Sequence, residues 1–273
     1  MEMGKLIAQG RTAEVFDYDK DSIIKLYRKE MKKEASEYEF NIGGIIEASG
    51  INSPKVKGLI DMDGRKGIVF EKITGSTMLR LMSSKPYRLK KLAREFAQLH
   101  YSIHNCIATA ELLSQKDNLK RRIKAVDMLS EEKKSVIINY LNQLEDGECI
   151  CHSDFHPDNI IMSQKGPVII DWMTCTKGSS LSDVARTVLI LKCGQVPGDK
   201  SCIERLSIDI FRKKLLKYYL DEYLKLSKVS LEQIDRWQLP IAAARLIEWL
   251  PLEEKQELMK VIDDKLKGLG SNV

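Results

Sequence analysis

The chain has 273 residues, of which 43% are hydrophobic and 30% charged, with a formal net charge of +5. A chain of this length and composition can bury a full hydrophobic core, in one large domain or in two lobes. No apolar run reaches the roughly 18 residues that a membrane span needs, and the first residues lack the basic and apolar regions of a signal peptide. We therefore expect a cytoplasmic protein that does not enter a membrane.

Lysine and arginine are spread along the chain, which makes nucleic-acid binding a weak hypothesis. The densest basic cluster, at 120–124, is typical of a solvated helix face. The cysteines form no C-x-x-C pair and show no zinc spacing. Cys149 and Cys151 point to the same face of an expected strand, which suits core packing better than metal binding. We interpret all six cysteines as reduced thiols; they are Cys106, Cys149, Cys151, Cys175, Cys193 and Cys202.

The N-terminal region begins with three short strand-like runs, at 6–8, 14–16 and 23–26. The turn between the first two runs contains Gly10. A turn of small residues between strands lets backbone N–H groups approach phosphate oxygens. One glycine is weak evidence alone, because most such turns only reverse the chain.

A helical pattern follows over 29–49, where apolar residues recur at helical spacing. Two further strands, at 56–60 and 66–70, flank a strong hairpin signal at 61–64. Together these runs predict an antiparallel sheet of about five strands. The segment 71–75 then leads out of the sheet.

The middle of the chain is mostly helical by periodicity. From 89 to 104 the apolar residues form one stripe. His100 and His104 stand at the i, i+4 spacing of metal ligands, but no glutamate accompanies them as it does in a zincin. We interpret them as interior or surface histidines. More helix is expected over 107–146, with Ser130 as an N-cap.

The C-terminal third is also helical by periodicity. Ser180 or Ser182 is expected to cap a helix that begins there. The pattern then continues over 199–268, with Ser201 and Ser230 as helix starts.

The most informative stretch is a hairpin near the middle of the sequence. An apolar strand delivers a loop that carries His152, Asp154 and Asn159, and a second apolar run at 168–170 ends on Asp171. Phosphoryl transfer needs this set: one carboxylate to orient a hydroxyl and accept its proton, and oxygen ligands that hold Mg²⁺ on the phosphates. The His-x-Asp-x-x-x-x-Asn spacing is the signature of a kinase catalytic loop. The alternative is a polar hairpin with solvated acids.

Two short motifs carry a resemblance to a known family. Residues 152–159 read His-Ser-Asp-Phe-His-Pro-Asp-Asn, and residues 170–172 read Ile-Asp-Trp. This hairpin resembles the aminoglycoside phosphotransferase-like (choline kinase-like) family of small-molecule kinases, whose pattern is roughly His-Gly-Asp-x-His-Pro-x-Asn and then Ile-Asp-Trp. Ser153 stands where the family often has glycine. The supporting features extend from Gly10 to about Arg186.

The resemblance implies an α+β, two-lobed protein-kinase-like fold. A small antiparallel-sheet N-lobe over 1–74 would bind the nucleotide. A large, mainly helical C-lobe over 75–273 would carry the catalytic loop and the acceptor pocket.

Lys25 lies on the third strand, where the resemblance places the lysine that contacts the nucleotide phosphates. Three glutamates of the following helix could pair with it: Glu34, Glu37 and Glu39. We choose Glu39, because the family's pairing glutamate lies a similar distance before a Pro-x-Val strand start, here at 54–56.

The remaining nucleotide-binding roles also follow from the resemblance. Gly10 would approach the phosphates together with Lys25. At the exit from the sheet, the Glu71 carbonyl and the Ile73 amide would hydrogen-bond the purine of ATP or GTP.

The roles in catalysis are divided among three side chains. Asn159 and Asp171 would bind Mg²⁺, and Asp154 would orient the acceptor hydroxyl and take its proton. His152, and in the same way His156, would hold the loop by hydrogen bonding rather than act as a base.

Beyond the hairpin, the family usually has an Asp-x-x-Arg motif whose aspartate braces the catalytic loop. Asp183 and Arg186 stand at these positions. Asp171 is followed by Trp-Met rather than Phe-Gly, and no Ala-Pro-Glu occurs. Only 183 − 171 = 12 positions separate Asp171 from Asp183, too few for the long activation segment of a protein kinase. We expect a small-molecule acceptor.

The acceptor itself stays open. Over 228–273 there are eight acidic and seven basic residues, a net charge of −1, which is no acidic patch for a polycationic aminoglycoside. A folded pocket could still gather a few acids for an aminoglycoside, and choline-, thiamine- and sugar-like acceptors are open as well. A second hypothesis, a catalytically silent nucleotide-binding (pseudokinase) regulatory module, would require the loss of a residue that is in fact present. The oligomeric state is not predicted.

Overall fold

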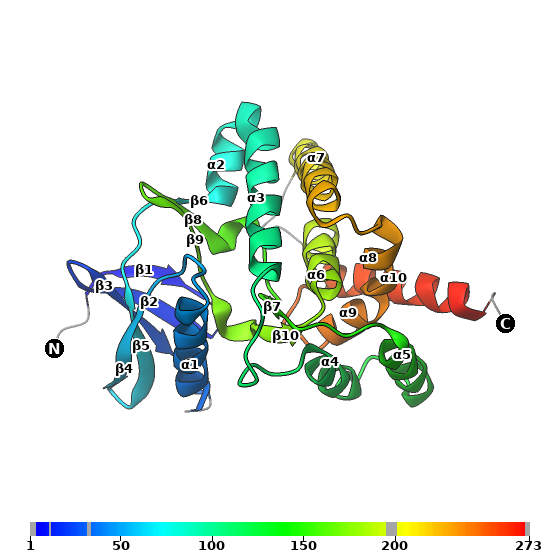
Figure 1. The fold of residues 1–273 in the computed structure, drawn as a ribbon, viewed down its shortest axis with the longest axis horizontal. Coiled ribbons are helices and arrows are strands. Elements are labelled where there is room, and N and C mark those ends of the chain that lie inside the picture. Colours follow the sequence, from blue (N-terminus) through cyan, green and yellow to red (C-terminus); the bar gives the residue numbers. More distant parts are fainter. Residues whose placement is uncertain (1–3, 11, 32–33, 195–200, 271–273) are drawn as a thin grey trace. The chain divides into compact units, whose positions relative to one another are not determined.

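The computed structural model describes residues 4–10, 12–31, 34–194 and 201–270. The chain divides into two compact units, each described here by itself (Figure 1). The first unit combines Met1–Ser84 with Pro157–Thr174, and the second combines Lys85–His156 with Cys175–Val273. The first unit therefore includes the ten residues after Thr74 and part of the catalytic hairpin as well as the sheet. The lobe boundary expected near Thr74 stays a prediction.

A five-stranded sheet is the centre of the first unit. Its strands are β1 (Leu6–Gln9), β2 (Ala13–Asp19), β3 (Ser22–Tyr27), β4 (Val56–Met62) and β5 (Arg65–Glu71). Their spatial order is β1-β2-β3-β5-β4, and every neighbouring pair is antiparallel. The antiparallel N-terminal sheet predicted from the sequence is confirmed.

The turn between β4 and β5 lies at the predicted hairpin signal. Asp63 and Gly64 have φ angles of 53° and 72°, and positive φ at both central residues is what a type I′ turn requires. Met62 pairs with Arg65, so the strand ladder starts directly beside the turn.

Helix α1 (Glu34–Ala48) packs against β4 and β5 (Figure 1). Its buried positions include Glu39, Gly43 and Ile46, spaced three and four residues apart on one helix face. A Cβ on Gly43 would overlap the Cγ1 atom of Val56. The glycine therefore permits a close approach of helix and sheet, and the same face directs Glu39 inward.

The rest of the first unit contains the catalytic hairpin, which is part of a second sheet. A three-stranded sheet has the order β6-β8-β9. The elements are β6 (Ser76–Thr77), β8 (Ile160–Ser163), β9 (Gly166–Ile169), helix α2 (Met78–Ser84) and two 3₁₀ turns, η2 (Pro157–Asn159) and η3 (Trp172–Thr174). The Ile169 amide donates to the Asn52 carbonyl at 2.9 Å, which ties the hairpin to the segment that follows α1.

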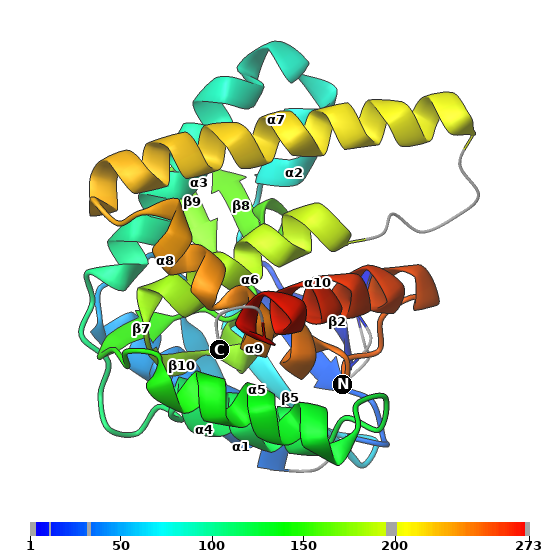
Figure 2. The same ribbon diagram turned by 90° about the vertical axis from the view of Figure 1, so that its right-hand side faces the viewer.

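The second unit is mainly helical. Its elements are η1 (Pro86–Arg88), α3 (Leu89–His104), α4 (Gln115–Lys124), α5 (Glu131–Gln143), α6 (Ser180–Cys193), α7 (Cys202–Ser227), α8 (Leu231–Arg236), α9 (Gln238–Arg245) and α10 (Leu252–Gly270). Helices α3 and α7 lie side by side (Figures 1 and 2). Every residue of α9 is buried, and α4, α5, α6, α8 and α10 all pack against it. In the described part of the chain, no helix is long and apolar enough to cross a membrane.

Three of the predicted helix starts are confirmed by capping hydrogen bonds. The hydroxyls of Ser130, Ser201 and Ser230 each accept from the backbone N–H three residues later. Ser201 and Ser230 form full capping boxes, in which the third residue, a Glu or Gln, also accepts from the cap's own N–H.

The predicted cap of α6 is wrong. The first helical residue is Ser180, so the N-cap is Ser179 rather than Ser180 or Ser182. The Ser179 side chain makes no capping hydrogen bond. Ser180 and Ser182 lie inside the first turn. The Ser179 amide instead donates to the Gln115 side chain at 3.0 Å, a partner 64 residues away that local sequence does not reveal.

The catalytic loop begins at the end of a short two-stranded sheet in the second unit. Strand β7 (Cys149–Cys151) pairs antiparallel with β10 (Thr176–Gly178). The loop that starts at His152 is therefore anchored on paired backbone at its entry.

Candidate active site

Lys25 is held between two carboxylates within the first unit. Its Nζ lies 2.8 Å from Oε1 of Glu39 and 2.9 Å from Oδ1 of Asp171. Burial lowers the pKa of Lys25, whereas the two carboxylates raise it, and their effect is the larger. The pKa thus lies above its ordinary value and the side chain is charged at neutral pH.

The phase of α1 decides which glutamate reaches Lys25. Glu34 and Glu37 are exposed, whereas Glu39 is 3% exposed. The Tyr27 hydroxyl donates to the second carboxylate oxygen of Glu39. Burial and the Glu39 charge raise the pKa of Tyr27 above its usual range, so this hydroxyl remains a donor. The carboxylate therefore has a fixed position and both of its oxygens have partners.

The backbone segments that carry Asp171 and Asn159 are hydrogen-bonded at the open end of the hairpin. The Ile170 amide donates to the Asn159 carbonyl at 3.0 Å, one step beyond the pair of Ile160 with Ile169. Asp171 has a φ of 63°, a conformation that favours glycine. Its side chain is 48% exposed, which leaves a carboxylate open to a cation. Carboxylate and amide oxygens are ligands that Mg²⁺ accepts.

The other predicted nucleotide contacts lie along the sheet. Gly10 is exposed between β1 and β2, where its amide donates to the Ala13 carbonyl at 2.8 Å and its carbonyl accepts from the Arg28 side chain at 3.2 Å. Its neighbour at position 11 lies outside the described residues. Glu71 ends β5 and Ile73 follows it. Their contacts with a purine stay a prediction.

Asp154, the predicted base, belongs to the second unit. Arg186 Nη2 lies 3.4 Å from its Oδ1, and His156 Nε2 lies 3.6 Å from its Oδ2. Burial raises the pKa of this carboxyl. The contact with His156 and the charge of Arg186 lower it by more, so the pKa lies below its ordinary value. The carboxylate is ionised and 33% exposed, so it can accept a hydrogen bond from a hydroxyl.

Arg186 is itself anchored by a residue that sequence reasoning missed. Its Nη1 donates to Oε1 of Glu248 at 2.8 Å. Arg122 and Arg245 also pair with Glu248. Burial raises the pKa of Glu248, but the three guanidinium groups lower it below its ordinary value. Glu248 lies 62 residues beyond Arg186, and no spacing rule connects them.

Asp183 braces the catalytic loop, as expected for its motif. Its Oδ2 accepts from the His152 amide at 2.6 Å and its Oδ1 from the Ser153 amide at 2.8 Å. Ser153 has a φ of 61°, which explains physically why glycine suits this position. The Ser153 hydroxyl bonds Thr176 Oγ1 at 2.9 Å, a contact that glycine could not make.

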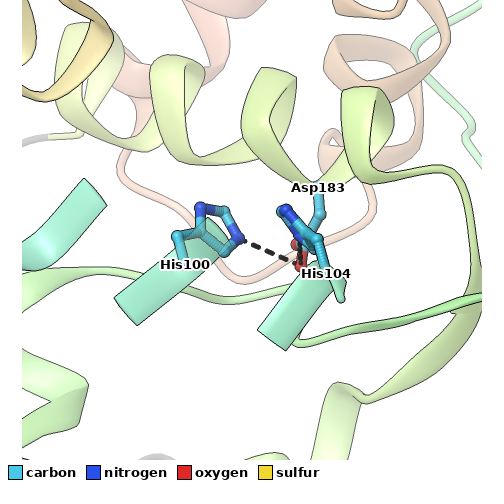
Figure 3. Close-up of side chains that lie close together, drawn as sticks. All are labelled: His100, His104 and Asp183. Atoms are coloured by element: carbon cyan, nitrogen blue, oxygen red, sulfur yellow. Dashed lines mark hydrogen bonds and ion pairs between the residues drawn. The ribbon is translucent and has the colours of Figure 1, made fainter. Parts of the chain in front are cut away.

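Two histidines reach the same aspartate (Figure 3). The Nε2 atoms of His100 and His104 lie 3.2 and 3.3 Å from Asp183 Oδ2. On the opposite side of each ring, Nδ1 lies 2.7 Å from a tyrosine hydroxyl, Tyr219 for His100 and Tyr223 for His104. Burial lowers the pKa of His100 to about 3, so its ring is neutral.

Both histidines are interior. The sequence had left open whether they are interior or surface residues. Their side chains are 0% and 3% exposed. The i, i+4 spacing did signal that they share a helix face. Their common partner lies on another helix, and the sequence did not indicate it.

Comparison with solved structures identifies the fold as that of a kinase. A ternary complex of a thermostable mutant of aminoglycoside phosphotransferase APH(4)-Ia with AMP-PNP and hygromycin B aligns with a TM-score of 0.67 at 11% identity, covering 96% of this chain and 92% of that one. The amicoumacin kinase hAmiN, in complex with AMP-PNP, Ca²⁺ and Ami, aligns with a TM-score of 0.60 at 13% identity, covering 96% and 88%. Aminoglycoside-3′-phosphotransferase of type VIII aligns with a TM-score of 0.61 at 17% identity, covering 89% and 93%.

The fold and the carboxylate chemistry together define a small-molecule kinase. More narrowly, residues 4–207 match the phosphotransferase enzyme family (APH), and the chain belongs to that family. No curated protein sequence matches it significantly.

Proposed function

We propose that this protein transfers the γ-phosphoryl group of Mg²⁺-ATP or Mg²⁺-GTP to a hydroxyl of a small molecule. The observation that carries the proposal is the pairing of Lys25 with both Glu39 and Asp171. A half-buried strand lysine that is fixed by a helix glutamate and lies next to a metal-binding aspartate is the arrangement that protein kinases need for catalysis.

The nucleotide side of the site belongs to the first unit. Lys25, released from Asp171, would contact phosphate oxygens while Glu39 keeps it in place. The Gly10 turn would approach the same phosphates, and the Glu71 carbonyl and Ile73 amide would bond the purine. These assignments rest on position and on the family pattern.

The donor set at the hairpin end fits Mg²⁺. Asn159 and Asp171 offer amide and carboxylate oxygens on backbone segments joined by a hydrogen bond. Bound there, Mg²⁺ would neutralise negative charge on the phosphates during transfer. Among the residues that the structure describes, Lys25 is the one cation that forms an ion pair with Asp171, so an incoming nucleotide that draws the lysine away leaves the carboxylate to the metal.

The acceptor side is served by Asp154. Its lowered pKa makes it a weak base, so its main contribution is to orient the hydroxyl, with the proton moving as the new bond to phosphorus forms. Arg186 holds this carboxylate, and Glu248 holds Arg186. Positioning of this kind supplies much of the rate in phosphoryl transfer.

A small acceptor is supported by the short connection after the hairpin. Between Asp171 and Asp183 the chain forms only η3, β10 and the start of α6, with no separate segment to present a peptide. Two of the kinases compared above were solved with a small molecule besides the nucleotide analogue, one with hygromycin B and one with Ami. In this chain Glu248, which pairs with Arg186, also pairs with Arg122 and Arg245, so its carboxylate offers little to a polycation. Aminoglycoside, choline-, thiamine- and sugar-like acceptors are the classes to test.

A nucleotide-consumption screen tests the function. Purified protein is incubated with Mg²⁺-ATP or Mg²⁺-GTP and a panel of alcohols, amino sugars and vitamins, and nucleoside diphosphate formation is measured beside Lys25→Ala. We expect one acceptor class to raise turnover well above background in the wild-type protein alone. Phosphate transfer to a generic protein but to no small alcohol, or equal turnover in the two proteins, would contradict the proposal.

A further inference from the structure

We propose that His100, His104 and Asp183 form a binding site for a transition-metal ion of the Zn²⁺ class, separate from the Mg²⁺ site of the first unit. Each side chain offers one ligand atom, and the three atoms all lie within 4.8 Å of one another. Both Nε2 atoms lie beside the same carboxylate oxygen, and dashed lines mark these two contacts in Figure 3.

The spacing of the ligand atoms fits a tetrahedral ion. Zinc binds histidine nitrogen and carboxylate oxygen at about 2.0–2.1 Å, which gives a tetrahedron edge of about 3.3 Å. The observed Nε2–Oδ2 separations are 3.2 Å for His100 and 3.3 Å for His104. Two edges of the tetrahedron therefore exist already, and three protein ligands leave one position for water.

The Nδ1 atom of each ring, which faces away from Asp183, has a hydrogen-bond partner that suits metal binding. Ligating histidines usually donate their second ring N–H to an oxygen, and here Tyr219 and Tyr223 place a hydroxyl oxygen 2.7 Å from each Nδ1. Each hydroxyl has a further side-chain partner, Thr187 for Tyr219 and Ser180 for Tyr223.

Both rings can therefore change tautomer when an ion binds. The proton leaves Nε2 and is carried on Nδ1, which donates to the tyrosine oxygen, while the hydroxyl turns towards its second partner. The exchange moves one proton within each ring and releases none to solvent, and Asp183 keeps its charge, so the step balances.

The ligand types select the kind of ion. Two imidazoles and one carboxylate suit Zn²⁺ or Co²⁺, whereas Mg²⁺ prefers oxygen ligands throughout. His104 is the last residue of α3, and the end turn of a helix opens more readily than its middle. Opening of this last turn would give an ion its path to the buried site.

Occupation of the site would act on the catalytic loop; this step rests on the proposed function. Asp183 Oδ2, the proposed ligand, also accepts from the His152 amide. Coordination would pull this oxygen and its negative charge towards the ion. The hydrogen bond from the His152 amide, two residues before Asp154, would then weaken. We expect bound Zn²⁺ to slow phosphoryl transfer.

Cobalt substitution tests the site without any need for turnover. The full-length protein is freed of metal with a chelator and titrated with Co²⁺, whose four-coordinate complexes absorb in the visible range. We expect one equivalent to bind per chain. His104→Gln should abolish the absorption, and the matched control His156→Gln, a histidine outside the cluster, should retain it.

A second variant guards against a folding defect in the first. Tyr223→Phe keeps every ligand but removes the oxygen that faces His104 Nδ1, and losses of this kind weaken metal binding by about 10- to 100-fold. The proposal is overturned if no visible band appears, if His104→Gln binds Co²⁺ as the wild type does, or if the band depends on Cys151 (tested with Cys151→Ser) and not on His104.

Turnover is measured separately, with and without one equivalent of Zn²⁺ in each protein. Loss of rate in the wild type but not in His104→Gln supports the link to the catalytic loop. A protein that binds Co²⁺ but has no kinase activity would sink the proposed function and leave the metal site standing.

Discussion

At the scale of single residues, the two aspartates of the hairpin have different surroundings. Asp171 lies beside Lys25 in the first unit and is half exposed. Asp154 lies beside Arg186 in the second unit and is held by it. The difference suggests different duties, one towards the metal and one towards the acceptor, and it can be tested by removing one charge at a time.

Asp171→Asn is expected to weaken Mg²⁺-nucleotide binding as well as turnover, because a carboxylate is the better Mg²⁺ ligand. Asp154→Asn is expected to leave nucleotide binding nearly intact and to lower turnover by about two to four orders of magnitude. Calorimetric titration with nucleotide, beside a coupled assay of diphosphate formation, measures both. Our assignment fails if the effects on binding are exchanged, or if either variant keeps full activity.

Glu248 carries a prediction about pH. Its pKa in the folded state lies below the ordinary 4.5 because of Arg186, Arg245 and Arg122, against the opposing effect of burial. A group with a lowered folded pKa stabilises the protein above its unfolded pKa, and this stabilisation is lost as the pH falls through the folded value. Glu248→Gln should therefore cost about 1–3 kcal/mol at pH 7 and progressively less below about pH 4.5.

Urea denaturation of Glu248→Gln and wild type between pH 7 and pH 3 measures that difference. The exposed neighbour Glu253 provides the matched control, and Glu253→Gln should change stability little at any pH. A penalty for Glu248→Gln that does not shrink with acid would show that the arginines do not stabilise its charged form.

At the scale of elements, α1 positions Glu39 by lying close to the sheet. Two adjacent glycines make the same helix a sensitive test, because one faces the sheet and the other faces solvent. A Cβ at Gly43 would overlap Val56, whereas a Cβ at Gly44 would meet nothing within 4 Å.

Gly43→Ala should destabilise the protein by about 1–3 kcal/mol through overpacking. Gly44→Ala should stabilise it by about 0.5–1 kcal/mol, since alanine is the better helix former. Thermal or urea unfolding of the pair decides the matter. Gly43→Ala should also reduce activity if the position of α1 matters to Lys25; equal stability of the two variants would refute the close approach.

At the scale of the whole molecule, the residues of the proposed reaction are divided between the two compact units. Lys25, Glu39 and Asp171 belong to the first, and Asp154 and Arg186 to the second. Several backbone crossings join the units, because the hairpin leaves the second unit at His156 and returns to it at Cys175. A ligand bound by the folded chain should therefore be visible in the stability of the intact protein.

Mg²⁺-nucleotide at about 100 times its dissociation constant should stabilise the folded protein by about 2.7 kcal/mol, a rise of several degrees in Tm. Differential scanning fluorimetry with ATP and GTP measures the shift, with Mg²⁺ alone as the control and Asp171→Asn as the comparison variant. If neither nucleotide moves the Tm of the wild-type protein, the kinase mechanism proposed here loses its basis.

Much of the fold could be predicted because its signals are local. The Asp-Gly turn between β4 and β5, the capping boxes at Ser201 and Ser230, and the apolar stripe of α3 each depend on residues within one turn or one hairpin. Hydrogen bonding to near neighbours and the periods of helix and strand act over such distances, so the sequence alone determined these elements.

The partners of the site residues were decided by tertiary structure. Choosing Glu39 needed a family pattern, and the phase of α1 supplies its physical reason by burying this residue and exposing Glu34 and Glu37. The family motif marked Arg186, but no sequence signal connected it, Arg122 or Arg245 with Glu248.

The same holds for the histidine cluster and for the cap of α6. His100 and His104 are separated from Asp183 by 83 and 79 residues, and Ser179 from Gln115 by 64. Such contacts form only when packing brings distant helices together, and no local periodicity records which helix becomes the neighbour of which. The sequence by itself thus determined the elements and the polar residues of the hairpin, whereas tertiary packing decided which distant side chains hold those residues in place.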